Sequence, residues 1–400
     1  MSAAPSDAAG VLREPARVGR LNRVGVLFGA LAVYALALQP LVTFRPNRIA
    51  AGKALGLLAA APEPAGAIAL AVFAVAVLAN LWRPVPAGVR AVAAMVALVA
   101  LVILAGLVPA HLTAPSNTIA RVSLASGFWL AFLAFGLLTA GGLADLRPRP
   151  VTRLLLLAGA AALAFGLLAS GRLAGLSVLK EYAAHADTFG TDALKHVELS
   201  FGTLVAAVLV GLPLGLACAV LPRLRAVTLP VLNVIQTVPS IAMYGLMMVP
   251  LGLLAARLPV LSDLGIRGIG TAPAAIALFL YSLLPVVANT VTGLAEVPAT
   301  AREAARGMGM SARQRLLRVE VPLAAPVILT GIRIVLVQNI GLVTVAALIG
   351  GGGLGTFVFQ GIGQAAIDLV LLGAIPIIAL AFAAAVVLDA VVDLTRRVPS

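Results

Sequence analysis

Cysteine, histidine and charged residues are all scarce in this 400-residue chain. The single cysteine, Cys218, excludes an internal disulfide. The three histidines, His111, His185 and His196, lie far apart and have no cysteine partners, so we expect no metal site and no cofactor. Only 11% of the residues are charged, whereas 62% are hydrophobic. A soluble domain of this size does not cover so much apolar surface with so little charge.

Phosphate-binding motifs are missing as well. The run Gly350–Gly353 is not followed by Lys and Ser or Thr, and the only Gly-Lys pair, Gly52-Lys53, has Asn47 where a P-loop has its first glycine. The chain therefore does not supply its own ATPase. We interpret the glycine run as a tight turn at the end of a membrane span. The spans also lack a carboxylate pair, a His cluster or a nucleophile arrangement, which argues against a membrane enzyme.

Long apolar segments are abundant. Each is close to the ~20 residues that a helix needs to cross the hydrocarbon layer. Ten such segments lie near residues 24–44, 66–82, 89–109, 123–143, 151–171, 199–221, 229–250, 273–291, 325–348 and 369–391. The predicted fold class is therefore an all-α polytopic membrane protein with about ten transmembrane helices.

The basic residues indicate the orientation of these spans. With the N-terminus inside, 18 of the 28 Lys and Arg residues lie on the cytoplasmic side and nine on the outer side. Because cytoplasmic loops carry the excess of Lys and Arg, both termini are predicted to be cytoplasmic. Topology signals of this kind also account for the net charge of +13, so we expect membrane lipid and not nucleic acid as a partner.

The longest predicted outer loop divides the chain. We interpret it as a linker with a short surface helix; a plain linker is the alternative. The predicted regions are a cytoplasmic tail (1–23), an N-terminal five-span accessory region (24–171), the external loop (172–198), a second set of five spans (199–391) and a cytoplasmic tail (392–400).

A polar segment, Glu296–Pro322, interrupts the second set of spans. It holds five arginines: Arg302, Arg306, Arg313, Arg315 and Arg318. The charge bias predicts that this loop is cytoplasmic. We predict two short helices within it. Pro298 suits the first helical position of one helix, and Gly307 and Gly309 end it. Ser311 with Gln314 forms a capping box for the other helix, which Pro322 stops. The first helix would present one small, flat face, made of Ala301, Ala304 and Ala305.

Several spans of the second set carry polar residues. Polar groups are costly in hydrocarbon unless they face other helices or water. A translocation pathway and helix–helix hydrogen bonding are the two interpretations. The tentative pathway residues are Gln236, Thr237, Pro239, Ser240, Asn289, Gln338 and Asn339. Arg333 also lies within a span; we expect it to snorkel to the inner surface, the alternatives being a pair with Glu320 or with a partner subunit.

The polar loop resembles the cytoplasmic loop of the membrane subunits of binding-protein-dependent ABC importers. The family pattern is Glu-Ala-Ala, three residues, Gly, nine residues, then Ile-x-Leu-Pro. Here it is Glu303-Ala304-Ala305, Gly309 and Val319-Glu320-Val321-Pro322, with Val at both aliphatic positions. The resemblance implies that this EAA motif couples to an ATP-binding subunit through Glu303, Ala304, Ala305, Gly309 and Pro322. An ordinary basic cytoplasmic loop is the alternative.

From about His196 to Val391 the chain is similar to osmoprotectant permeases. The matching phrases are Val234-Ile235-Gln236-Thr237-Val238-Pro239-Ser240, Phe279-Leu280-Tyr281-Ser282-Leu283-Leu284-Pro285 and Ala347-Leu348-Ile349-Gly350. The resemblance implies that region 199–391 is an ABC permease core with the type I importer fold in a bacterial cytoplasmic membrane. It also implies a compatible solute such as glycine betaine, two ATP-binding subunits, a second permease subunit and an external solute-binding protein.

The first five spans resemble those of a longer subgroup of glycine betaine uptake permeases, and no motif in them specifies a function. With only 5% aromatic residues, an aromatic cage for a quaternary ammonium is expected in the binding protein instead. A secondary transporter with an inverted repeat of five spans is the rival interpretation. Against it, the two halves share no motif, and only the second has the long basic loop.

Overall fold

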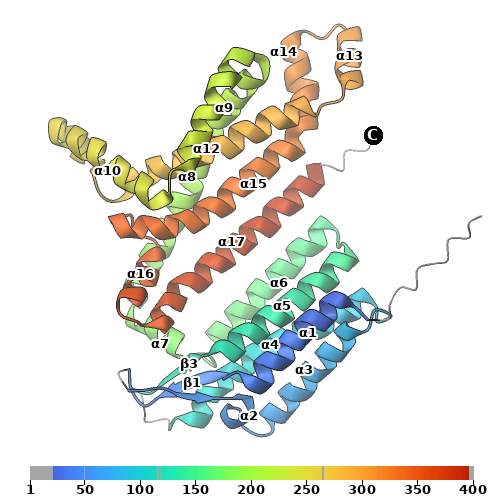
Figure 1. The fold of residues 1–400 in the computed structure, drawn as a ribbon, viewed down its shortest axis with the longest axis vertical. Coiled ribbons are helices and arrows are strands. Elements are labelled where there is room, and N and C mark those ends of the chain that lie inside the picture. The colour runs from blue at the N-terminus through green and yellow to red at the C-terminus, as the bar shows by residue number, and fades with distance from the viewer. Residues whose placement is uncertain (1–20, 49, 115–116, 118, 264, 396–400) are drawn as a thin grey trace, which may run out of the picture. The chain divides into compact units, whose positions relative to one another are not determined.

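The computed structural model describes residues 21–48, 50–114, 117, 119–263 and 265–395. The chain forms two compact units, unit 1 (Met1–Arg147) and unit 2 (Pro148–Ser400). Both are mainly helical, which confirms the predicted fold class (Figure 1). Most of the predicted tail 1–23, and the end of the tail 392–400, lie outside the described residues.

Unit 1 is a bundle of apolar helices with a small sheet. Its elements are α1 (Arg23–Leu38), β1 (Val42–Arg45), β2 (Lys53–Leu55), α2 (Leu57–Ala60), α3 (Ala65–Leu81), α4 (Ala87–Leu112), β3 (Arg121–Leu124) and α5 (Ser126–Leu146). Helix α5 packs on α1 and α4, and α3 packs on the same two helices. The core holds many alanines, together with Phe73 and Phe135, whose rings stack with their centroids 5.3 Å apart.

The sheet of unit 1 was not predicted from the sequence. Its strand order is β2-β1-β3, and both pairings are antiparallel, with Val42 opposite Leu55 on one side and Leu124 on the other. Strands of three or four residues are too short to give a recognisable alternation of polar and apolar side chains.

Unit 2 is built around three central helices. Its elements are α6 (Pro150–Ala169), α7 (Ser177–Ala184), α8 (Ala186–Val220), α9 (Pro222–Thr237), α10 (Ser240–Arg257), α11 (Pro259–Asp263), α12 (Thr271–Ala295), α13 (Ala299–Gly307), α14 (Ala312–Arg315), η1 (Leu316–Glu320), α15 (Val321–Ala346), η2 (Ala347–Ile349), α16 (Gly355–Gly363) and α17 (Ile367–Thr395). Helices α8, α12 and α15 pack on one another. Small residues permit this, because a methyl group at Gly215 would lie 2.7 Å from Cβ of Thr290.

The other helices of unit 2 surround this centre. Helix α17 packs on α15, and α6, α7 and α16 pack on α17, whereas α9 and α10 contact α12. Figure 1 shows α13 and α14 together at the end of α12 and α15, at the top of the view. The loop predicted from the sequence is therefore a compact structure at one end of unit 2.

Eight helices of the described residues are long and apolar enough to cross a membrane, and two further apolar helices, α1 and α3, are shorter. Each of the ten predicted spans overlaps a helix, and the count of ten stays a prediction. The span predicted at 229–250 is wrong as one continuous helix: the chain breaks at Val238 and Pro239, between α9 and α10. Pro239 donates no backbone hydrogen bond and disfavours the helical conformation of the preceding residue.

The segment predicted as an external loop, 172–198, is largely helical. It contains α7 and the first part of α8, which begins at Ala186 and continues for 35 residues. The predicted surface helix is thus present, and the apolar run from residue 199 is the later part of a longer helix. Three glycines of the run Gly350–Gly353 have positive φ, which agrees with the predicted turn at a span end.

Candidate functional site

Helix α13 of the polar loop ends in a Schellman motif. Gly309 has φ of +75°, and its N–H bonds to the carbonyl of Arg306 (2.9 Å), while Met310 N–H bonds to the carbonyl of Ala305 (3.1 Å). These two bonds satisfy carbonyls that the helix end would leave unpaired. Only glycine adopts this left-handed conformation without strain. Gly309 therefore lies at the end of the first helix, as predicted, although Pro298 is the N-cap and not the first helical residue.

Helix α14 begins at the predicted capping box. The Gln314 N–H donates to Ser311 Oγ (3.3 Å), and the Ser311 N–H donates to Gln314 Oε1 (2.9 Å). The prediction that Pro322 stops this helix is wrong. The helix runs through the π-turn η1 into α15, and Pro322 lies in the first turn of α15. A proline in the first turn of a helix costs little, because its missing N–H group would have no partner there. The π-turn just before it also changes the pattern of backbone hydrogen bonds.

The motif residues point in two directions. Glu303 and Ala304 are exposed, whereas Ala305 is only 1% exposed. Of the small face predicted for Ala301, Ala304 and Ala305, the chain itself therefore covers the part at Ala305. The side of α13 that carries Ala305 is covered by the chain, and α13 contacts η1 and α14. The Glu303–Ala304 edge is thus left accessible, while Ala305 helps to pack the loop.

A charged cluster holds the loop together. Glu320, at the end of η1, receives a hydrogen bond on Oε1 from Arg315 Nε (2.7 Å), and its Oε2 forms an ion pair with Arg302 Nε (3.4 Å). Arg302 also donates to the carbonyl of Leu294, at the end of α12. These residues were not grouped from the sequence, although Glu320 was considered as a partner of Arg333.

Asn339 lies at the centre of unit 2 and is fully buried. Its Nδ2 donates to Thr203 Oγ1 of α8 (3.0 Å), and its Oδ1 accepts from Ser282 Oγ of α12 (3.1 Å). His196 of α8 contributes a further contact between its Nε2 and the carbonyl of Ile340 (3.0 Å). The side chain of Asn339 thus joins three helices, and sequence reasoning missed its partners Thr203 and Ser282.

Four of the other predicted pathway residues meet at the break between α9 and α10. Gln236 Nε2 donates to the carbonyl of Tyr281 of α12 (2.8 Å), and Tyr281 OH donates back to the carbonyl of Val238. Thr237 and Pro239 are exposed, and Ser240 is half-buried. The break is therefore fixed to α12 by two hydrogen bonds while its tip stays accessible.

The remaining two predicted pathway residues lie apart from this group. Asn289 Nδ2 donates to the carbonyl of Pro285 in its own helix (2.8 Å), and Gln338 is half-buried on α15. The predicted set is therefore not one cluster: it divides into the α9–α10 break, the buried Asn339 and two single side chains.

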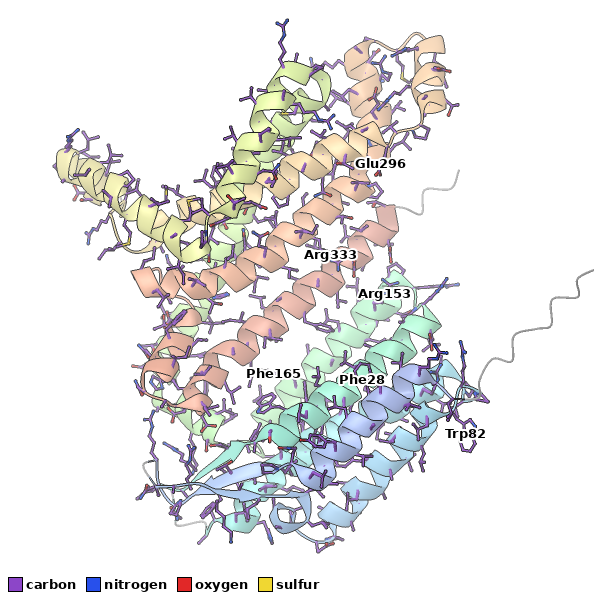
Figure 2. All side chains as sticks on the ribbon, in the orientation of Figure 1. Phe28, Trp82, Arg153, Phe165, Glu296 and Arg333 are labelled. Carbon is purple, nitrogen blue, oxygen red and sulfur yellow. The ribbon has the colours of Figure 1, made fainter. Side chains whose placement is uncertain are left out.

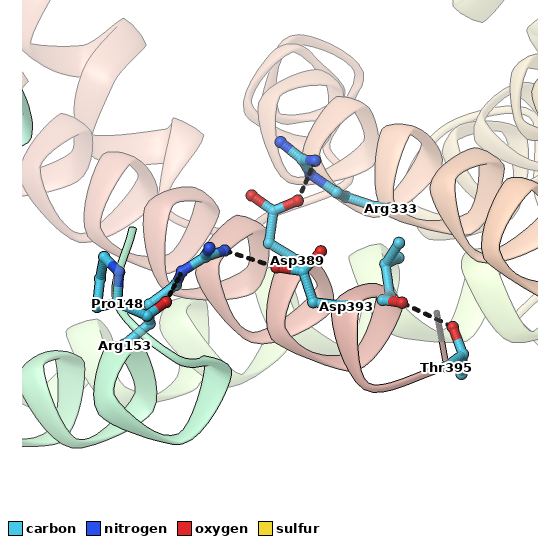
Figure 3. Close-up of polar contacts among 7 residues, drawn as sticks. Pro148, Arg153, Arg333, Asp389, Asp393 and Thr395 are labelled. Carbon is cyan, nitrogen blue, oxygen red and sulfur yellow. Dashed lines mark hydrogen bonds and ion pairs between the residues drawn. The ribbon is translucent and has the colours of Figure 1, made fainter. Parts of the chain in front are cut away.

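Arg333 has a partner that was not named from the sequence. It pairs with Asp389 of α17, and one turn further along α17 Asp393 pairs with Arg153 of α6 (2.9 Å) (Figure 3). Figure 2 places Arg333 along α15 and Arg153 on α6. The spacing of Asp389 and Asp393 puts both carboxylates on the same face of α17. These aspartates were not connected with the two arginines from the sequence, since periodicity does not show which helix lies opposite.

Metal ligands are not gathered anywhere in the part of the chain that the structure describes: no group of three or more His, Cys, Asp or Glu side chains could hold an ion. The expectation that the chain needs no cofactor stays untested.

These features define a helical protein with several helices long and apolar enough to cross a membrane and a capped, exposed loop at one end. The family described as binding-protein-dependent transport system inner membrane component matches residues 211–397. The family described as ABC transporter permease YehY, N-terminal domain, matches residues 22–179.

Individual relatives match about half of this chain. The osmoprotectant import permease protein OsmW of Salmonella typhimurium is 44% identical over 175 residues, which are 44% of this chain and 76% of that protein. The choline transport system permease protein OpuBB of Bacillus subtilis is 36% identical over 203 residues, or 51% of this chain and 84% of that protein. A solved structure titled inward facing conformations of the MetNI methionine ABC transporter is 22% identical, with a TM-score of 0.42, over 51% of this chain and 94% of that one.

The chain belongs to the family of binding-protein-dependent transport system inner membrane components. It is a permease subunit of the ABC importer class, and the prediction of a transport subunit in place of an enzyme is confirmed by this membership. The rival interpretation, an ion-driven secondary transporter, is thereby removed.

Proposed function

We propose that this chain forms the translocation pathway of an importer for a small compatible solute such as glycine betaine. ATP hydrolysis occurs in two separate ATP-binding subunits, an external solute-binding protein delivers the solute, and a second permease subunit, the same chain or a related one, completes the pathway. The assembly lies in the bacterial cytoplasmic membrane with both termini of this chain inside.

The ordered loop Glu296–Pro322 carries this proposal. A Schellman motif, a capping box and the Glu320 ion pairs fix its shape without any partner. Its exposed edge at Glu303 and Ala304 is small and partly charged, which suits docking into a groove of an ATP-binding subunit. In alternating access, closure of the ATP-binding subunits moves this edge, and the permease changes from one state to the other.

The solute is proposed from the relatives. The names of relatives refer to osmoprotectants, to choline, and to glycine betaine with carnitine and choline. Glycine betaine, carnitine and choline share a quaternary ammonium group. A compact organic cation or zwitterion of this kind is therefore the proposed solute class.

The proposed pathway uses the half-exposed polar side chains of unit 2. Gln236, Ser240 and Gln338 are each partly accessible in the single chain, whereas Asn339 has no accessible surface. Accessible polar groups on membrane helices suit a water-filled path shared with the second permease subunit. We assign Asn339 to helix packing.

Residues 24–171 are proposed to be an accessory region that braces the permease core. The core is proposed to occupy 199–391, with the loop 172–198 outside the cell. The orientation follows from the arginine-rich segments, which favour the cytoplasmic side.

The test is reconstitution of the complex in proteoliposomes with its ATP-binding subunit and binding protein. Ala304→Arg places a long charged side chain on the docking edge, so uptake of labelled glycine betaine and stimulation of ATP hydrolysis by the loaded binding protein should both fall at least tenfold. Ala304→Ser, which stays small, is the matched control and should keep both. Full uptake and full stimulation in Ala304→Arg would contradict the proposal.

A further inference from the structure

Glu320 is a charged side chain in a place where charge is costly. It is only 9% exposed, and it stands at the junction of the polar loop and the apolar helix α15. A buried carboxylate is tolerated when cations and hydrogen bonds compensate it. Its Oε1 accepts a hydrogen bond from Arg315 Nε at 2.7 Å, and its Oε2 forms an ion pair, without a hydrogen bond, with Arg302 Nε at 3.4 Å.

The π-turn brings two of these groups together. Arg315 and Glu320 are five residues apart, and in a regular α-helix side chains at that spacing are separated by about 140° around the axis. The turn η1 winds more loosely over Leu316–Glu320 and lets the two side chains meet on one side. π-bulges of this kind occur frequently at functional sites.

Arg302 extends the contact to a second helix. Its guanidinium pairs with Glu320 and also donates to the carbonyl of Leu294, in the last turn of α12. The Leu294 carbonyl also accepts a long hydrogen bond from the Val297 N–H (3.4 Å), and a cation at a helix C-terminus interacts favourably with the helix dipole. One arginine of α13 is therefore bound both to the end of α12 and to the start of α15.

The residue after Arg302 is the exposed Glu303. One side of α13 thus offers an edge to a partner while the adjacent side is bound to two long helices of unit 2. If α13 moves as a rigid piece, α12 and α15 move with it; if the contacts to Glu320 are lost, α13 can move alone.

We propose that Glu320 is a positioning residue for energy coupling, which it performs by holding Arg302 and Arg315 so that displacement of α13 is passed to α12 and α15. This rests on the proposed role of the loop in contacting an ATP-binding subunit. Loss of the Glu320 charge releases α13 from the two helices without altering the exposed edge, so the ATP-binding subunit still docks and hydrolyses ATP but no longer drives uptake.

The test compares solute imported per ATP hydrolysed in the complete reconstituted complex. Glu320→Gln and Arg302→Gln should each lower this ratio at least tenfold while the ATP-binding subunit still co-purifies. Glu320→Asp keeps the charge and should recover part of the ratio. Arg318→Gln is the matched control, because Arg318 is an exposed arginine of the same π-turn, and it should keep the parent ratio.

An unchanged ratio in both Glu320→Gln and Arg302→Gln overturns the proposal. A merely structural role would lower the amount of assembled complex and leave the ratio per complex intact, which also overturns it. If Glu320→Gln does not assemble, the ratio in Arg302→Gln decides. Failure of the proposed function is distinguishable, since the parent complex itself would then show no stimulation of ATP hydrolysis by the binding protein.

Discussion

Unit 1 and unit 2 bury their apolar side chains in different ways. Unit 1 has one continuous core cluster that joins its helices and its sheet. Unit 2 has several small clusters, such as the one around Tyr244 and Tyr281 and the one around Cys218 and Val287. Helix α10 has only three buried residues among eighteen, and α9 only one among sixteen. Both units leave large apolar side chains exposed, such as Val75 of α3 and Leu246 of α10, but in unit 2 the helices α9 and α10 are left almost wholly for lipid or another chain.

The buried polar groups differ in the same way. In unit 1 Asn80 donates to the carbonyls of Ala76 (2.9 Å) and Arg90 (3.1 Å), and Arg90 pairs with Asp145 (2.7 Å). These contacts fasten neighbouring helices of one bundle. In unit 2 the polar contacts lie in separate places, at Asn339 in the centre and at Glu320 at the end of the loop. The difference favours a brace for unit 1 and a moving part for unit 2.

The largest effect is expected from the backbone of the loop. Gly309→Val should reduce uptake at least tenfold, because an L-residue in the left-handed conformation costs about 1–2 kcal/mol, and valine is β-branched. Gly309→Asn should be milder, since asparagine tolerates this conformation better. Uptake by proteoliposomes containing the whole complex measures both.

A glycine of unit 1 supplies the contrast. Gly88 lies in the first turn of α4, and no atom lies within 4 Å of a Cβ added there. Gly88→Ala should raise the thermal midpoint slightly and leave uptake unchanged, since alanine is favoured over glycine in a helix by about 1 kcal/mol. Equal losses of uptake in Gly88→Ala and Gly309→Val would contradict the division of roles.

A middle-sized effect is expected for the two buried asparagines. Asn80→Leu and Asn339→Leu should each lower the free energy of unfolding by about 1–2 kcal/mol. Each substitution removes a side-chain amide and leaves its buried partners without that hydrogen bond. The thermal midpoint of the purified complex reports this loss. Uptake per assembled complex should stay within twofold of the parent in both variants.

The same experiment also tests whether Asn339 belongs to the translocation pathway. If Asn339→Leu kept its thermal midpoint and lost uptake tenfold, its amide would serve the solute and not the packing of three helices. Asn80→Leu is the matched control, since Asn80 is just as buried but belongs to unit 1.

The smallest effect is expected from removal of unit 1. Chains that begin at residue 148 or at residue 171 should both assemble with the ATP-binding subunit, as expected for a brace. The shorter chain lacks α6 and leaves Asp393 without Arg153, whose ion pair contributes about 1 kcal/mol or less when partly exposed. It should therefore have the lower thermal midpoint of the two. Loss of assembly by an inserted chain that begins at 148 would show that unit 1 has more than a bracing role.

Much of this structure could be predicted from local sequence signals. Apolar length gave a helix for every expected span, and Ser311, Gln314 and Gly309 marked the caps of the loop because capping depends on nearest neighbours. The break at Pro239 was missed because a continuous apolar run does not show where its helix bends. Pro322 was misread because a proline can follow the end of one helix or lie in the first turn of the next. The neighbouring residues do not show which of the two applies.

Contacts between distant segments could not be predicted in this way. The partner of Arg333 is Asp389, 56 residues further along the chain, and nothing in either segment specifies the other. The burial of Ala305 was likewise hidden, because the three small residues of α13 look equivalent until η1 covers one side. Tertiary packing decides which residues form such pairs, and a single sequence does not show which distant segments pack together.

The central claim is that the exposed edge of α13 meets the ATP-binding subunit. The most direct measurement is photo-crosslinking in the assembled complex, with the same crosslinking amino acid placed at Ala304 or at Ala305. A crosslink from position 304 to the ATP-binding subunit, and at least tenfold less from position 305, is the predicted result. Strong crosslinks from position 305 alone, or none from 304 in a complex that transports, would contradict the account.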